Sequence, residues 1–163
     1  MSDFASSYSF VSLLEVHGQL EELFLQHQEA LIALDIPRAR ALLERYERAL
    51  VVPRRDEDEL LLPLYEQAGE APRGPAELFT GEHEKIRRQV TRFFALVDEL
   101  ALAPTPRGVV ALITDQALFK GLMEHHDLRE RELLYPTLDR AVPDEGERAQ
   151  LLARMGESLD PHK

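Results

Sequence analysis

Four stretches of the chain repeat apolar residues at the three- and four-residue spacings of an α-helix, and this repetition restricts the fold more than any other feature. The clearest stretch runs from Phe79 to Leu100, where seven inward positions follow one another at spacings of 4, 3, 4, 3, 4 and 3. Residues spaced in this way share one face of a helix. Comparable stripes run from Leu13 to Leu31, from Leu43 to Leu64 and from Phe119 to Leu133. The sequence therefore predicts an all-α protein.

Proline and glycine fall between these stretches and mark the expected turns. Breaks are predicted at Asp35-Ile36-Pro37, within residues 69–75, within residues 103–108 and before Pro143. Asp35 is a candidate helix cap, and Pro37 suits a first helical turn. Short connections favour antiparallel neighbours. We predict an up-down-up-down antiparallel four-helix bundle with a short extra C-terminal helix, as a single domain over residues 1–163. Its core is expected at about residues 10–140, with an extension over residues 141–163.

Composition narrows the classes of protein. The formal net charge of −11 argues against a nucleic-acid binder and against attraction to an anionic membrane surface. The chain has no cysteine, which excludes disulfides, thiolate metal ligands and thiol catalysis. The first residues do not resemble a signal peptide, and no apolar run has the length of a membrane span. A cytoplasmic protein is the expectation.

Five polar residues interrupt the inward stripes. They are His17 in the first stretch, Glu57 in the second, His83 in the third, and His126 with Glu130 in the fourth. His126 and Glu130 are four residues apart, so both face inward on the same helix. Burying imidazoles beside carboxylates is costly unless a partner satisfies them. A metal ion is one such partner.

The positions of the turns test whether these five residues share one level of the bundle. In an antiparallel hairpin, residues equidistant from the turn lie side by side. With turns centred near residues 35, 70 and 104–105, position 83 lies opposite Glu57, His126 opposite His83, and position 53 opposite His17. The five residues are therefore expected within about one helical turn, roughly 5 Å, of one level.

The other histidines serve as internal controls. His27 lies on the same stripe as His17 but roughly 15 Å nearer the turn, and its level-mates Leu43, Val97 and Leu112 are apolar. We interpret it as a histidine at the edge of the core. His125 points about 100° away from His126, and His162 is a tail residue. None of the three is expected to bind metal.

Imidazole and carboxylate ligands without sulfur suit iron, manganese or zinc. Two carboxylates at one level can bridge two ions, and iron is favoured if dioxygen chemistry is involved. The rest of the acidic run 56–59, apart from Glu57, is interpreted as a solvated helix face.

The motifs also carry a family resemblance. A lone His17, the E-x-x-LLLP run of residues 57–63, the EHEKI string of residues 82–86, and H-x-x-x-E followed by LLYP at residues 126–136 resemble the hemerythrin-like (HHE cation-binding) domains. The resemblance covers roughly residues 10–140. It implies a four-helix bundle around a non-heme di-iron centre that binds dioxygen or reports on iron and oxygen. It makes His17, His83 and His126 terminal ligands, and Glu57 and Glu130 bridging carboxylates.

Two positions depart from the family pattern. The family's second helix has a histidine ten residues before its proline, as His126 precedes Pro136, but Pro53 stands ten residues before Pro63. A second histidine common in the third helix is replaced by Arg87. The site is therefore expected to be a depleted one, with one or two ions. Because proline lacks an N–H and crowds the carbonyl four residues earlier, the helix is expected to kink or break at residues 51–54.

Three functions are consistent with this sequence. The leading hypothesis is a metal-binding bundle holding iron, or else zinc or manganese, for oxygen or iron binding or sensing, with dioxygen or a related small molecule as its ligand. The second is a metal-free bundle that acts as an interaction or regulatory module, in which the polar layer fixes helix register. The third, resting on family analogy alone, is a redox enzyme for peroxide or nitric oxide. No catalytic residue is assigned.

Overall fold

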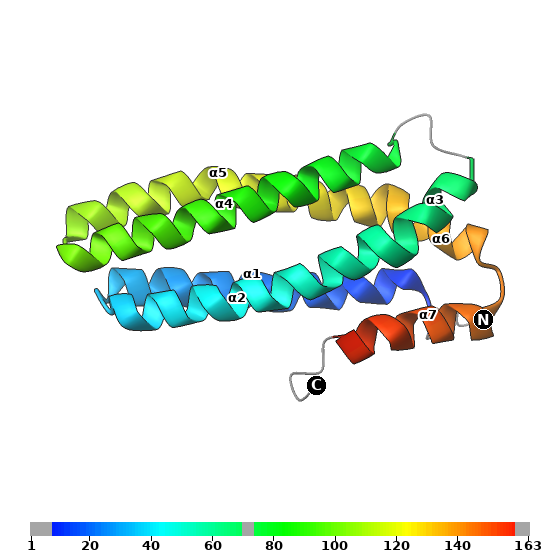
Figure 1. Cartoon of the computed structure of the whole chain (residues 1–163), viewed down its shortest axis with the longest axis horizontal. Coiled ribbons are helices and arrows are strands. Elements are labelled where there is room, and N and C mark those ends of the chain that lie inside the picture. The colour runs from blue at the N-terminus through cyan, green and yellow to red at the C-terminus, as the bar shows by residue number, and fades with distance from the viewer. Residues whose placement is uncertain (1–7, 70–73, 159–163) are drawn as a thin grey trace, which may run out of the picture.

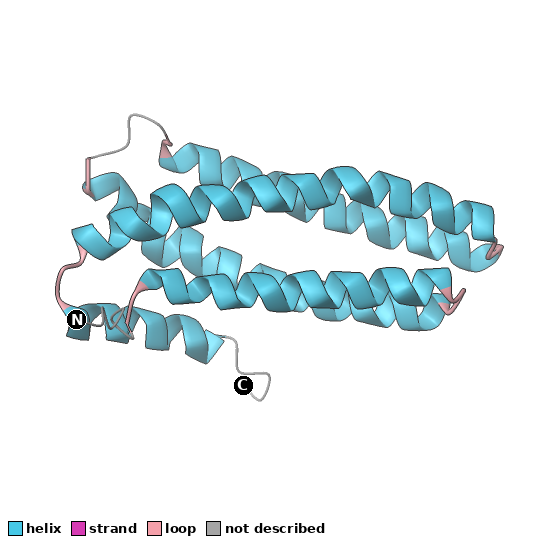
Figure 2. Ribbon diagram, turned by 180° about the vertical axis from the view of Figure 1, so that it is seen from behind, coloured by secondary structure: helices cyan, strands magenta, loops and turns pink. Residues whose placement is uncertain are grey.

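The computed structural model describes residues 8–69 and 74–158, and the regular elements in this part of the chain are helices joined by short connections (Figure 2). His162 lies outside the described residues. In chain order the elements are η1 (Phe10–Leu13), α1 (Leu14–Ile32), α2 (Ile36–Asp56), the π-helical turn η2 (Glu57–Leu61), α3 (Leu62–Gln67), α4 (Ala76–Leu102), α5 (Pro106–Arg129), the π-helical turn η3 (Glu130–Leu134), α6 (Tyr135–Ala141) and α7 (Glu145–Ser158). None of the described helices combines the length and the apolar character needed to cross a bilayer.

The long helices form the predicted four-helix bundle. Figure 1 shows α1 and α2 as one layer and α4 and α5 as the other, with successive helices running in opposite directions. Contacts of α1 with α2, α2 with α4, α4 with α5, and α5 with α1 close the bundle. The C-terminal helix was also predicted: α7 turns back and packs against α2.

The turns lie where proline and the capping residues place them. The Asp35 carboxylate accepts a hydrogen bond from the backbone N–H of Arg38 at 3.2 Å, as expected for an N-cap. The Thr105 hydroxyl caps α5 in the same way, accepting from the N–H of Gly108 at 3.1 Å. The expected turns near residues 35 and 104–105 are thus confirmed, whereas residues 70–73 of the middle turn lie outside the described residues.

Pro53 does not interrupt the helix that contains it. A kink or a break was expected at residues 51–54. The break is wrong, because the α2 helix runs through Pro53 to Asp56. The departure from α-helical geometry comes four residues later, at η2, and recurs at η3. Leu62 N–H bonds the Glu57 carbonyl, and Tyr135 N–H bonds the Glu130 carbonyl, five residues back in each case.

A proline stands beyond the end of each π-helical turn, after one intervening residue. Pro63 and Pro136 have no N–H to donate, and each ring would crowd the carbonyl four residues earlier in a regular α-helix. Widening the turn by one residue relieves this crowding. Single π-helical turns of this kind occur mostly inside α-helices and often at functional sites. Here both begin at a carboxylate that the sequence places in the polar layer.

The apolar core is divided into two clusters. The cluster nearer the α1–α2 and α4–α5 turns contains Phe24, Tyr46, Phe93 and Phe119 among its buried residues. The cluster at the opposite end contains Phe10, Phe79, Leu134, Leu138 and Met155. The predicted polar residues belong to neither cluster. They form a layer between the two.

The turn between α1 and α2 allows a direct test of local geometry. Leu34 has a φ of 57°, while Asp35 N–H bonds the Ala30 carbonyl at 3.0 Å and Leu34 N–H bonds the Leu31 carbonyl at 2.9 Å. This pattern is a Schellman motif, whose left-handed position favours glycine. We expect Leu34→Gly to have a free energy of unfolding about 1 kcal/mol higher than Leu34→Ala, because only glycine adopts this φ without strain. Urea unfolding followed by circular dichroism measures it.

Ile32 provides the matched control, because it is exposed and ends α1 in ordinary helical geometry. There the order should reverse, with Ile32→Gly less stable than Ile32→Ala by roughly 0.5–1 kcal/mol. The same order at both positions would contradict a left-handed requirement at residue 34.

Candidate metal centre

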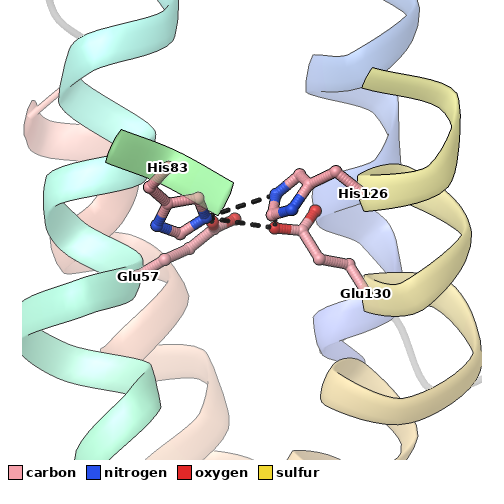
Figure 3. A group of neighbouring side chains, drawn as sticks. All are labelled: Glu57, His83, His126 and Glu130. Atoms are coloured by element: carbon pink, nitrogen blue, oxygen red, sulfur yellow. Dashed lines mark hydrogen bonds and ion pairs between the residues drawn. The ribbon is translucent and has the colours of Figure 1, made fainter. Parts of the chain in front are cut away.

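Four of the five predicted residues converge at the centre of the bundle. Glu57, His83, His126 and Glu130 are buried, and each offers one ligand-type atom within 4.8 Å of the others. Figure 3 shows Glu57 and His83 facing His126 and Glu130, the last two of which come from one continuous helical segment. The reflection of residues through the turns therefore predicted their common level.

The imidazole Nε2 atoms are directed to this centre. His83 Nε2 lies 3.2 Å from His126 Nε2 and 3.4 Å from Glu57 Oε2. His126 Nε2 lies 2.6 Å from Glu130 Oε1, which is 3.7 Å from His83 Nε2. Two nitrogen atoms and two carboxylates thus face one small volume.

His17, the fifth residue, reaches the layer from the other side of Glu130. Its Nε2 atom lies 2.9 Å from Glu130 Oε2, whereas Glu130 Oε1 faces His126. His17, Asp127 and Glu130 form a second group whose ligand-type atoms also lie within 4.8 Å of one another. The two groups share Glu130, so this carboxylate has the geometry to bridge two neighbouring positions. That any of these residues binds metal stays a prediction.

A carboxylate faces the Nδ1 atom of each histidine. Asp58 Oδ1 lies 2.7 Å from His83 Nδ1, Glu82 Oε2 lies 2.8 Å from His126 Nδ1, and Asp127 Oδ1 lies 3.3 Å from His17 Nδ1. The contacts of Asp58 and Glu82 are hydrogen bonds, which fix the ring orientation of His83 and His126 and direct Nε2 to the centre. Asp127 and His17 lie within ion-pair distance but form no hydrogen bond.

The sequence interpretation missed these three carboxylates, although each neighbours a predicted residue in the chain. The rest of the acidic run 56–59 was interpreted as a solvated face, and Glu59 is indeed exposed. The interpretation was wrong for Asp56, which is buried, and for the half-buried Asp58, whose carboxylate bonds a buried imidazole.

Arg54 enters the centre, and the sequence interpretation did not identify it. Its side chain is buried, and its Nη1 atom contacts His126 Nε2 and lies 3.4 Å from Glu130 Oε1. Arg54 is three residues before Glu57, so the two share a helix face. This spacing of three residues from Glu57 was the signal in the sequence that could have identified Arg54.

Tyr135 is the aromatic residue of the layer. Its hydroxyl oxygen lies 2.9 Å from Glu57 Oε1 and 3.1 Å from Glu130 Oε2. On a regular α-helix, five residues turn Tyr135 about 140° away from Glu130. The π-helical turn η3 lies between them and brings the hydroxyl back to the carboxylate. A pattern based on 3.6 residues per turn cannot reveal this contact.

The two buried carboxyl groups have opposite pKa shifts. Burial raises the pKa of Glu57 well above its usual value, and the nearby charge of Glu130 raises it further. Burial also acts to raise the pKa of Glu130, but the charge of His126 and hydrogen bonds from His126, His17 and His83 lower it well below its usual value. The two shifts favour the protonated form of Glu57 and the ionised form of Glu130.

The histidine controls differ from each other. His125 is exposed, as predicted. His27 is fully buried rather than at the edge of the core, so that interpretation needs correction. Its Nδ1 atom donates to the Ala39 carbonyl at 2.7 Å, and its Nε2 atom accepts from Gln116 Nε2 at 2.9 Å. Both ring nitrogens are satisfied, which explains how this histidine is buried without a metal.

Comparison with known families places the chain. The model of the hemerythrin HHE cation binding domain matches residues 10–138. The chain belongs to this family. The match includes the whole polar layer and all four long helices of this hemerythrin-type domain. No curated protein and no solved structure gives a significant match. Membership supports a cation-binding function for the buried cluster of histidine and glutamate.

The residues present fit a metal ion. Among the described residues, the buried atoms Glu57 Oε2, His17 Nδ1 and Asp127 Oδ1 have no hydrogen-bond partner. Buried polar atoms are normally satisfied, so such atoms need an explanation. A cation at the centre would supply a partner for Glu57 Oε2. It would also offset the charge of two carboxylates that lie close together in an apolar bundle.

The raised pKa of Glu57 gives the metal-free protein a defined pH dependence. Below about pH 4.3, the usual pKa of glutamate, the carboxyl group is protonated in both the folded and unfolded states. As the pH rises through the raised folded pKa, ionisation favours the unfolded state and stability is lost. Glu57→Gln cannot ionise, so its stability advantage over the wild type should grow with pH over this window. Urea unfolding with chelator at a series of pH values measures the difference.

Glu59→Gln is the matched control, because it removes the same charge from an exposed position two residues away. Its stability relative to the wild type should change little over the same pH range. Parallel stability curves for the wild type and Glu57→Gln would contradict the raised pKa.

Proposed function

We propose that this bundle binds a transition-metal cation, iron in the first place, through Glu57, His83, His126 and Glu130. His17 and Asp127 form an adjoining position across Glu130. The observation that carries the proposal is the convergence of Nε2 atoms on one point while a carboxylate faces each Nδ1 atom. This arrangement is the usual one for metal-binding histidines in proteins.

The choice of metal follows from the donor atoms. Imidazole nitrogen and carboxylate oxygen suit iron, manganese and zinc, and the chain has no cysteine to favour softer ions. Iron adds reversible electron transfer and binding of small oxygen species when present. We therefore propose that the protein binds or senses oxygen or iron. The cytoplasm is its proposed location.

The protein's own residues would prepare the site for this cation. Asp58 and Glu82 hold the protons of His83 and His126 on Nδ1, which leaves each Nε2 lone pair available. Glu130 presents one oxygen to each side of the layer. The Tyr135 hydroxyl lies between Glu57 and Glu130 and holds the two carboxyl groups in position.

A cavity beside the layer supports a small apolar ligand such as dioxygen. It has a volume of about 170 Å³ and reaches His17, Arg54 and Glu57 at its polar end. Its apolar wall comes from α1, α2 and α7: Leu13, Val16, Leu20, Leu50, Leu152 and Met155. The C-terminal helix thereby closes one side of a space next to the proposed metal.

The first test is the metal content of the full chain loaded with Fe²⁺ without dioxygen. We expect at least one tightly bound ion per wild-type chain, measured by elemental analysis after desalting, and a lower melting temperature after chelation. An ion at about 100 times its Kd stabilises the folded state by about 2.7 kcal/mol, if it binds that state alone. His126→Ala should lose both properties.

His125→Ala is the matched control, since it removes the exposed neighbouring imidazole. It should retain metal and the effect of the chelator. Clearly substoichiometric metal in the wild type, with a melting temperature that chelator does not change, would contradict the proposal. That result would favour a metal-free interaction module, in which Arg54 and the histidines satisfy the buried carboxylates.

The second test concerns access through the cavity. Leu13→Phe adds volume at the cavity wall, so the Fe²⁺-loaded variant should consume dioxygen more slowly than the wild type, with an unchanged metal count. An oxygen electrode measures the rate. Leu25→Phe, at an exposed position of α1, should leave the rate unchanged. Equal rates for all three proteins would contradict this route.

A further inference from the structure

Arg54 occupies an unusual place for a charged side chain. It is 8% exposed, and its guanidinium group reaches the inner cluster of the polar layer. Its Nη1 atom contacts His126 Nε2 and lies 3.4 Å from Glu130 Oε1. Among the described residues, no other arginine or lysine forms a hydrogen bond with Glu57, His83, His126 or Glu130. A cationic group thus sits where the proposed function puts a metal ion.

The position of the guanidinium group makes this contact specific. Glu82 Oε2 lies 2.8 Å from His126 Nδ1, so Nε2 is the ring nitrogen that faces the centre of the layer. His126 Nε2 lies 2.6 Å from Glu130 Oε1, and Arg54 Nη1 contacts both residues. A metal ion bound by His126 and Glu130 would need the place beside these two atoms that Arg54 Nη1 occupies.

We propose that Arg54 is an internal competitor for the metal. Its guanidinium group occupies the place beside His126 Nε2 and Glu130 Oε1 until a cation displaces it. The inference rests on the proposed metal site but concerns a residue outside the predicted ligand set. Two positive groups cannot share His126 Nε2. Loading therefore requires the guanidinium group to leave the layer, and the metal affinity of the chain is lower than its ligands alone would give.

The structure offers the displaced side chain a destination. Arg54 also lines a cavity of about 270 Å³ between α2 with η2 and α4, which His83 lines as well. Three acidic residues line this cavity, Glu47, Asp58 and Glu59, together with the arginines Arg55 and Arg87. Glu47 and Asp58 are partly exposed, so a guanidinium group there would have both carboxylates and water. Rotation about the flexible Arg54 side chain reaches this space without moving α2.

The test compares the metal affinity of the full metal-free chain with that of Arg54→Met. Methionine keeps an unbranched side chain but removes the charge and the donors. Titration with Zn²⁺, and with Fe²⁺ in the absence of dioxygen, against a competing chelator should show at least about tenfold tighter binding by the variant. Arg48→Met removes the same charge from an exposed residue of the same helix that does not line this cavity, and it should leave the affinity unchanged.

The outcomes separate this inference from the proposed function. Metal binding by the wild type with equal or weaker binding by Arg54→Met overturns the competition and leaves the metal site intact. Metal binding by Arg54→Met without binding by the wild type supports the competition and overturns the proposal that the wild type binds metal. Binding by neither overturns both.

Two further measurements guard against a variant that does not fold. Arg54→Gln carries the same expectation as Arg54→Met. In the wild type, the nitrogen-15 NMR signal of the Arg54 guanidinium group should move when Zn²⁺ is added, while that of the exposed Arg48 should not. An unchanged Arg54 signal at saturating metal would overturn displacement.

Discussion

The structure depends on how two carboxyl groups are kept inside an apolar bundle. Glu57 and Glu130 are 3% and 0% exposed, a position that neither could occupy as an unpaired charge. Three imidazoles, a phenol and a guanidinium group surround them, and burial favours the protonated form of Glu57. All four long helices contribute to this layer. Hydrogen bonds and ion pairs link its groups, and a cation would supply the partner that Glu57 Oε2 lacks.

Local geometry places these groups. Each of the carboxylates begins a π-helical turn that a proline follows, and the two turns lie on neighbouring sides of the layer. The extra residue in each turn shifts the following helix, α3 or α6, relative to a regular continuation. In α6 this shift returns Tyr135 to the carboxylate five residues before it. The proline in each LLLP or LLYP string is therefore a positioning element for the site, although it contacts no ligand.

Much of this arrangement could be predicted because helical hairpins have few degrees of freedom. The turn positions and the period of 3.6 residues sufficed to place His17, Glu57, His83, His126 and Glu130 on one level. The residues that were missed gave weaker signals. Arg54 shares the helix face of Glu57 but reaches the layer with a long side chain from a position three residues earlier. Glu82 also uses a long side chain, and Tyr135 reaches the layer through a π-helical turn, so helical phase does not identify these two residues. Pro53 was misjudged for a related reason: α2 loses one backbone donor there but continues, because the rest of its hydrogen bonds remain.

The division of the apolar core has a consequence for folding. Two clusters of side chains lie on opposite sides of the polar layer, each closed by its own turns and helix ends. Apolar contacts make the folding of each cluster cooperative, but a layer of hydrogen-bonded and charged groups transmits that cooperativity less well. An ion held by several helices at once would join the two halves mechanically. The presence of an ion in the layer would then decide whether the bundle unfolds in one step or as two separate units.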